Sequence, residues 1–206
     1  MQKSPATRQL SNERFDVTHE TFERSSSQQQ LVLQMLNELI SSKKKSADAL
    51  RILSVGCGSG ILDNQLISAL APSIGSFEYT GVDPNPVACC RFLEDFRRLD
   101  LTGVKLDVKN KTVESLDVNE CFDVIQLTHS LYYFEDPADT LDKLRKLLSP
   151  GGKLIIVHAP NESLNQFLEC FWSRHVNQDI WFSDCLKEYL LNQGIEFTCY
   201  RIQGKV

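Results

Sequence analysis

The stretch that decides the fold is Ile52-Leu53-Ser54-Val55-Gly56-Cys57-Gly58-Ser59-Gly60, where an apolar run meets three glycines at alternate positions. A short β-rich run bounded by glycine is typical of a buried strand. Glycines directly after a strand allow a tight turn, and they let a ligand approach the backbone closely. A strand, a glycine turn and a following helix therefore favour a nucleotide-type site over an unspecialised loop.

The rest of the chain alternates between the two kinds of element. We expect helices at residues 28–40, 62–70, 86–99, 137–148 and 183–192, and strands at residues 51–55, 77–82, 104–108, 122–128, 153–158 and 195–202. This alternation predicts right-handed βαβ units and a doubly wound, mainly parallel, Rossmann-like α/β sheet. Such sheets bind ligands at the carboxyl ends of their strands. With 206 residues, we expect a single domain over 1–206, with an N-terminal helical segment of about 1–48 and a core of about 49–206.

Composition excludes several classes of function. The net charge of −5 comes without a basic stripe, which argues against nucleic acid as a partner. No apolar run approaches the roughly 18 residues of a membrane span, and no secretory leader is evident, so we expect a cytoplasmic protein with no membrane contact. The seven cysteines show no CxxC spacing, which predicts neither a disulfide framework nor a metal site. We expect a monomer.

The glycine spacing indicates which nucleotide is bound. A dinucleotide fingerprint needs its third glycine at position 61, where Ile61 stands, so a nicotinamide cofactor is disfavoured. Asp83 follows the second expected strand, 27 positions after Gly56. Its carboxylate is placed to accept hydrogen bonds from both hydroxyls of a ribose. The alternative is that Asp83 is a turn residue before Pro84.

Four motifs in order resemble the class I methyltransferases that use S-adenosylmethionine (SAM): VGCGSG, GVDPNP, FDVIQLTHSLYYFED and LLSPGGKLIIVHA. The resemblance covers about residues 51–202 and implies SAM as the cofactor. It also implies a seventh, antiparallel strand, for which no sequence remains after the sixth expected strand. The implied cofactor-binding residues are Gly56, Cys57, Gly58 and Gly60 for the methionyl end, Asp83 and Pro84 for the ribose, Thr112 and Val113 for the adenine, and Thr128.

RILSVGCGSG, the Leu131-Tyr132-Tyr133 triplet and the N-terminal helix are similar to the histamine N-methyltransferase family. The resemblance implies that Tyr132 and Tyr133 wall an amine pocket and that His129 and Gln28 contact the acceptor. His129 stands where the family has Gln, and Gln28 where it has an acid. Phe15 and Phe22 are expected to join them from an N-terminal lid over the cofactor.

Methyl transfer from a sulfonium needs an uncharged nucleophile held in line, and an alkylammonium must first lose its proton to a base. His129, with an ordinary pKa near neutrality, is the candidate base. The alternative is a bonding role at the end of its strand, and His158 is expected to be structural. Tyr132 and Tyr133 form either a cation-attracting wall or plain core. The Glu135-Asp136 pair either attracts a cationic amine or caps the next helix.

Three functions follow from these observations. The first is a SAM-dependent N-methyltransferase acting on a small, histamine-like amine or imidazole, with His129, Tyr132 and Tyr133 as catalytic residues. The second is a shortened SAM-binding isoform or homologue with little or no methyl transfer. The third, an oxidoreductase using a nicotinamide cofactor, is disfavoured by Ile61.

Overall fold

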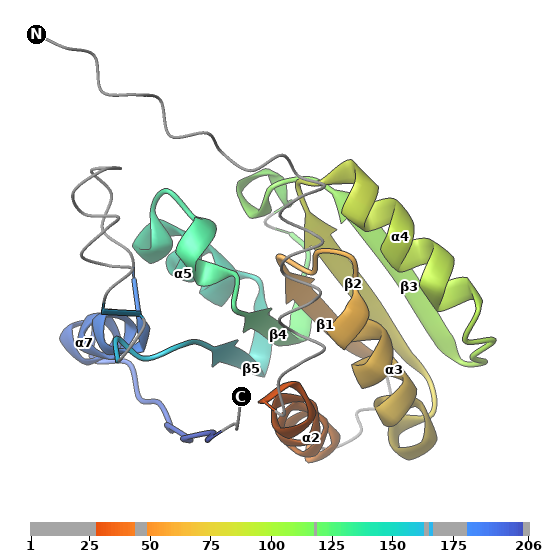
Figure 1. Cartoon of the computed structure of the whole chain (residues 1–206), viewed down its shortest axis with the longest axis horizontal. Helices are drawn as coiled ribbons and strands as arrows, with labels where there is room; N and C mark the ends of the chain where they lie inside the picture. The colour runs from red at the N-terminus through yellow and green to blue at the C-terminus, as the bar shows by residue number, and fades with distance from the viewer. Residues whose placement is uncertain (1–27, 44–48, 118, 163–164, 167–180, 204–206) are drawn as a thin grey trace, which may run out of the picture.

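A computed structural model describes residues 28–43, 49–117, 119–162, 165–166 and 181–203. Its centre is a sheet of five parallel strands in the order β3-β2-β1-β4-β5 (Figure 1). The strands are β1 (Leu50–Val55), β2 (Phe77–Asp83), β3 (Val104–Asn110), β4 (Phe122–Thr128) and β5 (Leu148–Val157). The order reverses between β1 and β4, as in a doubly wound sheet. The predicted parallel, Rossmann-like α/β fold is confirmed.

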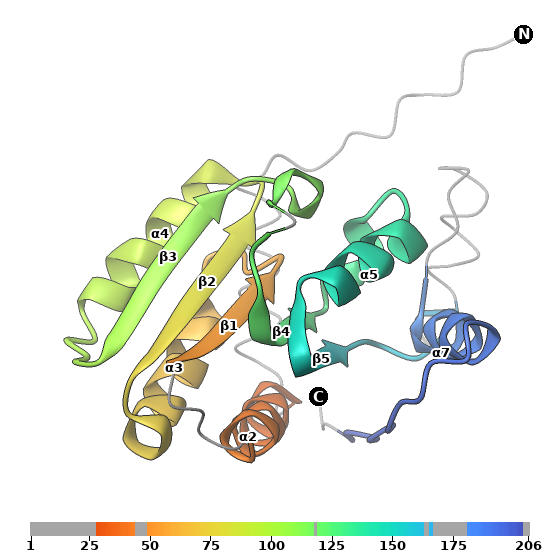
Figure 2. The ribbon, with the colours of Figure 1, turned by 180° about the vertical axis from the view of Figure 1, so that it is seen from behind.

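Helices cover the sheet on both sides because neighbouring strand residues point to opposite faces. On β1, Ile52 lies in one buried apolar cluster and Leu53 in the other. The Ile52 cluster packs under α2 (Gln28–Ser41), α3 (Ile61–Ile74) and α4 (Pro86–Arg97), and the Leu53 cluster packs under α5 (Pro137–Lys146) and α7 (Ser183–Asn192). Figure 2 shows the second side, with α5 and α7 flanking β4 and β5. Two short 3₁₀ helices, η1 (Val113–Ser115) and η2 (Leu131–Tyr133), follow β3 and β4.

Two helices begin with side-chain caps that the sequence supplies. Asn85 Oδ1 accepts hydrogen bonds from the backbone N–H groups of the first turn of α4, at 3.0 and 3.3 Å. Asp136 Oδ1 accepts from the N–H of Asp139 in the first turn of α5, at 2.9 Å. A proline follows each cap, where its missing N–H has no consequence. The capping role predicted for Asp136 is confirmed.

The strand predicted at residues 195–202 is wrong. Residues 195–203 form no strand, and the N–H of Ile195 instead bonds to Leu190 O at 2.9 Å, closing the end of α7. Phe197 and Tyr200 are exposed, at 40% and 55%. The composition of this segment suits a strand, but a strand exists only where a neighbour accepts its backbone hydrogen bonds. Within the described residues, the outer edge of β5 pairs with no strand.

The other differences concern boundaries. The helix predicted over 137–148 ends at Lys146, and β5 begins at Leu148 rather than at residue 153. Residues 150–152 lie inside β5 as an irregularity: pairing jumps from Phe122 with Leu148 to Val124 with Lys153. Within the described part of the chain, no helix combines the length and apolar character needed to cross a membrane.

Candidate functional site

The candidate site lies along the edge of the sheet where the parallel strands end. The glycine turn follows β1, Asp83 ends β2, Thr128 ends β4 and His158 follows β5. Because all five strands run in one direction, their carboxyl ends and the loops after them meet at this edge. Most of the residues predicted to bind a cofactor and an acceptor are therefore brought to one side of the molecule.

The three glycines of the turn all have left-handed backbone angles, with φ of 70° at Gly56, 53° at Gly58 and 71° at Gly60. A Cβ on Gly60 would lie 2.2 Å from the ring of Phe92, and one on Gly56 would lie 2.5 Å from Ser130 Cβ. A Cβ on Gly58 would meet nothing within 4 Å. Two glycines thus permit close packing, while Gly58 leaves space in which a ligand can approach the backbone.

Asp83 is oriented by the turn itself. Its Oδ2 accepts a hydrogen bond from Gly58 N at 2.9 Å, and its Oδ1 accepts from Asn85 N at 2.8 Å. Two further hydrogen bonds fix the backbone at the end of β2: Gly56 N donates to Val82 O at 2.8 Å, and Asn110 Nδ2 donates to Asp83 O at 3.1 Å. A carboxylate offers about four lone-pair positions, so each oxygen keeps one for a ribose hydroxyl. The residues present fit a cofactor that carries a ribose.

The other predicted cofactor residues differ in exposure. Cys57 is only 9% exposed, and burial, followed by the charges of Asp63 and Asp83, raises the pKa of its thiol well above the ordinary value. Its side chain therefore stays a neutral part of the core. Of the remaining predicted cofactor residues, Pro84 and Thr112 are exposed and Thr128 is half-buried. Val113 is only 2% exposed, because its side chain packs in the Leu53 cluster.

An aromatic group stands beside this site at the ends of β4 and β5. Its centre is Tyr132, whose ring stacks on His158 with centroids 4.1 Å apart and lies parallel to the ring of His129 at 6.5 Å. Phe182 contacts Tyr132 edge-on at 6.0 Å, and Tyr133 does so at 6.3 Å. We call these five residues the aromatic group. Sequence analysis predicted three of its members and assigned His158 only a structural role.

Backbone geometry fixes the two histidines relative to each other. His129 has a left-handed φ of 52°, and its N–H donates to Val157 O at 3.0 Å. Burial lowers the pKa of His158 to about 4, opposed by a hydrogen bond to the Trp181 carbonyl and assisted by His129. His158 is therefore neutral at physiological pH. Tyr133, in contrast, is 62% exposed.

Three predicted acceptor contacts lie towards the N-terminus. Phe15 and Phe22 are outside the described residues. Gln28 is the half-buried first residue of α2, a helix whose buried face packs against α3.

A buried polar network was missed by sequence analysis. Tyr79 OH donates to Asp63 Oδ1 at 2.6 Å, and Gln126 Nε2 lies 3.1 Å from Asp63 Oδ1 and 2.8 Å from Tyr79 OH. The same amide lies 3.1 Å from Ser54 Oγ, and all four side chains are at most 4% exposed. Burial raises the pKa of Asp63 and the pKa of Tyr79, and the charge of Asp63 raises the pKa of Tyr79 further. The sequence does contain an indication of this network, because polar residues within apolar strand runs are expected to be buried and to need hydrogen-bond partners.

The network lies directly beneath the cofactor edge. Asp63 is in the first turn of α3, immediately after the glycine turn, and Gln126 Oε1 accepts from Thr128 Oγ1 at 3.3 Å. It therefore joins the glycine turn, β2 and β4 through side chains as well as through the sheet.

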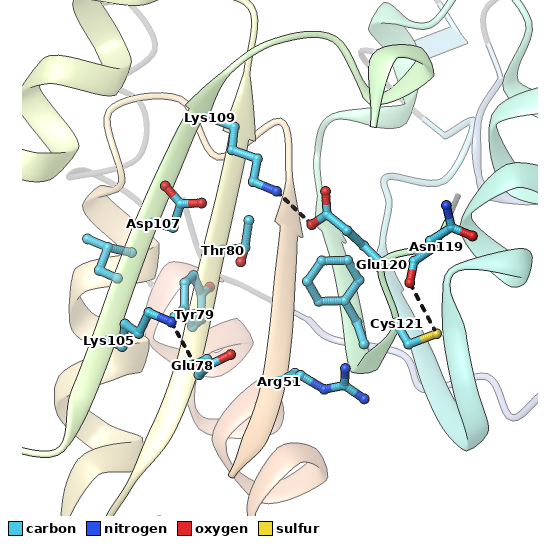
Figure 3. A pocket seen from close by; sticks show the side chains of 12 residues that line it. Arg51, Glu78, Tyr79, Thr80, Lys105, Asp107, Lys109, Asn119, Glu120 and Cys121 are labelled. Atoms are coloured by element: carbon cyan, nitrogen blue, oxygen red, sulfur yellow. Dashed lines mark hydrogen bonds and ion pairs between the residues drawn. The ribbon is translucent and has the colours of Figure 1, made fainter. Parts of the chain in front are cut away.

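A separate hollow of about 470 Å³ lies on the sheet face formed by β1, β2 and β3 (Figure 3). Its lysines are already paired, Lys105 with Glu78 at 2.9 Å and Lys109 with Glu120 at 2.6 Å. It lies on the strands rather than at their carboxyl ends, so we do not assign the cofactor to it. Among the described residues, no three His, Cys, Asp or Glu side chains gather as metal ligands.

Comparison with known proteins gives the family. Residues 12–198 match the sequence profile of a family described as "Methyltransferase domain". The ubiquinone biosynthesis O-methyltransferase of Colwellia psychrerythraea is 32% identical over 142 residues, which cover 68% of this chain and 52% of that protein. With several other curated relatives, the matched region spans only 3% to 30% of their length.

Solved structures agree in fold. The plantazolicin methyltransferase BpumL in complex with S-adenosylhomocysteine (SAH) superposes with a TM-score of 0.63 at 17% identity, covering 88% of this chain and 70% of that one. A possible histamine N-methyltransferase from Thermotoga maritima gives a TM-score of 0.56 at 20% identity, covering 90% and 79%. The family profile matches most of the sequence, and the chain has the fold of these solved methyltransferase structures. The chain therefore belongs to the methyltransferase domain family.

Proposed function

We propose that this chain transfers a methyl group from SAM to a nitrogen of a small amine or imidazole. The observation that carries the proposal is the position of the aromatic group, which stands at the same edge of the sheet as the glycine turn and Asp83. A ribose-binding carboxylate and a neutral, π-rich wall on neighbouring strand ends suit a cationic cofactor with a nitrogen acceptor beside it.

The cofactor half of the proposal rests on Gly58 and Asp83. Gly58 leaves room against the backbone, and Asp83 is held by two N–H groups with lone pairs to spare for a ribose. SAM, when bound, supplies a methyl group on a sulfonium. The protein's task is then to hold an uncharged nitrogen in line with that methyl, and orientation of this kind accounts for a large part of catalysis in general.

The acceptor half rests on Tyr132 and the two histidines. As the accepting nitrogen takes up the methyl it becomes positively charged, and the face of a tyrosine ring attracts a nearby cation. His129, in a strained backbone conformation at the end of β4, is the candidate base for an amine that arrives protonated. The similar fold of the Thermotoga protein, a possible histamine N-methyltransferase, is consistent with a nitrogen acceptor.

The relative from Colwellia is named an O-methyltransferase, so transfer to a hydroxyl is the second candidate. The aromatic group favours nitrogen because hydroxyl methylation needs a base strong enough to remove the hydroxyl proton, whereas burial lowers the pKa of His158 to about 4 and makes its imidazole a weak base. A SAM-binding chain without methyl transfer is the third candidate.

Calorimetric titration with SAH tests the cofactor half. We expect saturable binding by the wild-type chain, loss of that binding in Asp83→Ala and no binding of NAD. Asp107→Ala is the matched control, since Asp107 is an exposed carboxylate on β3 that lines the separate hollow. Equal loss in both variants would contradict the assignment of the ribose to Asp83.

A panel of acceptors tests the other half. Primary amines, imidazoles, phenols and carboxylates are each incubated with labelled SAM, and the methylated product is measured. We expect turnover with amines or imidazoles. Turnover confined to phenols or carboxylates would replace the proposal with O-methylation, and SAH binding without any turnover would favour a binding function.

A further inference from the structure

We propose that His158 is a specificity-determining residue whose Nδ1 accepts a hydrogen bond from an N–H of the methyl acceptor. This inference rests on the proposed function and narrows its substrate class. It selects imidazoles and amines that can donate an N–H to His158 while a nitrogen lone pair of the same molecule takes the methyl group. Sequence analysis expected only a structural role for this histidine.

The tautomer of His158 follows from its partner. Its Nε2 lies 2.5 Å from the backbone carbonyl oxygen of Trp181. A carbonyl oxygen only accepts hydrogen bonds, so the proton must be on Nε2. A neutral imidazole carries one N–H, which leaves Nδ1 as an unprotonated acceptor. The Trp181 contact thus fixes both the orientation of the ring and the chemical character of its other nitrogen.

Nδ1 of His158 is a buried acceptor that receives no hydrogen bond from any of the described residues. A buried acceptor without a partner destabilises the folded state, and such atoms are uncommon in folded proteins. The burial of this ring also keeps it uncharged at neutral pH, so that Nδ1 carries no proton. A ligand N–H that reaches Nδ1 would remove this penalty.

Tyr132 supplies the complementary donor. Its hydroxyl oxygen accepts from Ala159 N at 2.7 Å, and in the described part of the chain its own proton meets no acceptor. Its ring is stacked on His158 at 4.1 Å. Burial raises the pKa of Tyr132 to about 12, so this proton is retained at neutral pH. An available donor and an available acceptor therefore stand together. A neutral imidazole can present its N–H to Nδ1 of His158 while its other nitrogen keeps the lone pair that takes the methyl group.

Two substitutions of His158 distinguish the role of Nδ1 from that of Nε2. The amide nitrogen of His158→Gln takes the position of Nε2 and can donate to the Trp181 carbonyl, but Gln has no acceptor at the Nδ1 position. The amide oxygen of His158→Asn takes the position of Nδ1 but cannot reach that carbonyl. We expect His158→Gln to weaken acceptor binding about tenfold, the equivalent of one hydrogen bond. His158→Asn should weaken it less, and both variants should bind SAH like the wild type.

The probe is 4-methylimidazole, titrated calorimetrically into the SAH-saturated chain, with 1,4-dimethylimidazole as the matched ligand that lacks an N–H. We expect the wild type to bind the first more tightly and His158→Gln to lose the difference. In the wild type, the ¹⁵N resonance of the unprotonated Nδ1 should move upfield on binding while that of Nε2 stays in place. A purely structural His158 would leave the Nδ1 resonance unchanged.

The outcomes separate this inference from the proposed function. Equal binding of the two imidazoles by the wild type, no binding of either, or unchanged selectivity in His158→Gln overturns the role of His158, even if amines are methylated. Failure of the proposed function would appear instead in the acceptor panel, as turnover of oxygen acceptors only or no turnover. Reduced SAH affinity in both variants would show that His158 supports the fold, and would also overturn the inference.

Discussion

Gly58 and Gly60 share a left-handed backbone but have different surroundings, and this separates ligand binding from stability at the scale of single residues. Gly60 rests on the ring of Phe92, whereas Gly58 faces open space. Left-handed angles cost a residue with a Cβ about 1–3 kcal/mol, and an additional clash costs a similar amount. The same substitution at the two positions should therefore have two different effects.

We expect Gly60→Ala to lower the free energy of unfolding by about 2–6 kcal/mol, because strain and the clash with Phe92 add. Gly58→Ala should lower it by only about 1 kcal/mol but should abolish SAH binding, since the new methyl group occupies the space left for the ligand. Urea unfolding and calorimetry on both variants measure the two effects. Similar unfolding curves for the two variants would contradict the different roles assigned to these glycines.

The pKa of His158 gives a prediction of pH dependence. It lies at about 4, below the ordinary 6.5. Between these values the unfolded chain binds more protons than the folded chain, so stability is lost as pH falls from 6.5 towards 4. We expect His158→Gln to lose less stability than the wild type over this window, measured as urea midpoints at several pH values. Parallel decreases in the two proteins would show that His158 does not titrate in this way.

At the scale of elements, the buried network joins α3 to β2 and β4. Tyr79→Phe removes the hydroxyl that lies 2.6 Å from Asp63 Oδ1 and should lower the free energy of unfolding by about 1–3 kcal/mol. In an Asp63→Asn background the loss should be smaller, because the hydroxyl then bonds to a neutral group. Tyr200→Phe, which alters an exposed tyrosine, is the control and should unfold like the wild type.

The network also connects Thr128 to the helix that follows the glycine turn through hydrogen bonds. Asp63 follows that turn directly, and Thr128 donates to the far end of the same Gln126 amide. If Tyr79→Phe unfolded like the control, the network would have no measurable part in stability, and its role at the cofactor edge would need another explanation.

At the scale of the whole molecule, protection of the backbone should follow strand order. β2, β1 and β4 each have strands on both sides, whereas β3 and β5 lie at the ends of the described sheet. We expect amide hydrogen exchange to be slowest in β1, β2 and β4, faster in β3 and β5, and fastest in residues 195–203, which bond to no strand. Slow exchange in residues 195–203 would mean that this segment pairs with a strand in solution.

The sequence by itself determined the parallel α/β fold, the glycine turn and Asp83 at the end of its strand, and it offered helix capping as one of two roles for Asp136. These features depend on local spacing: apolar runs, glycines after a strand and a polar residue before a proline are all read from neighbours in the chain. The helix predicted at residues 183–192 is likewise confirmed, with the same bounds.

Tertiary structure alone decided which distant residues meet. Asp63 and Gln126 are 63 positions apart, and Trp181 fixes the tautomer of His158 from 23 positions away. The predicted strand at residues 195–202 is wrong for the same reason, since its β-rich sequence specifies a side-chain pattern but not a neighbouring strand. Periodicity encodes which face of an element is buried, whereas hydrogen-bond partners across the sheet depend on how the elements pack.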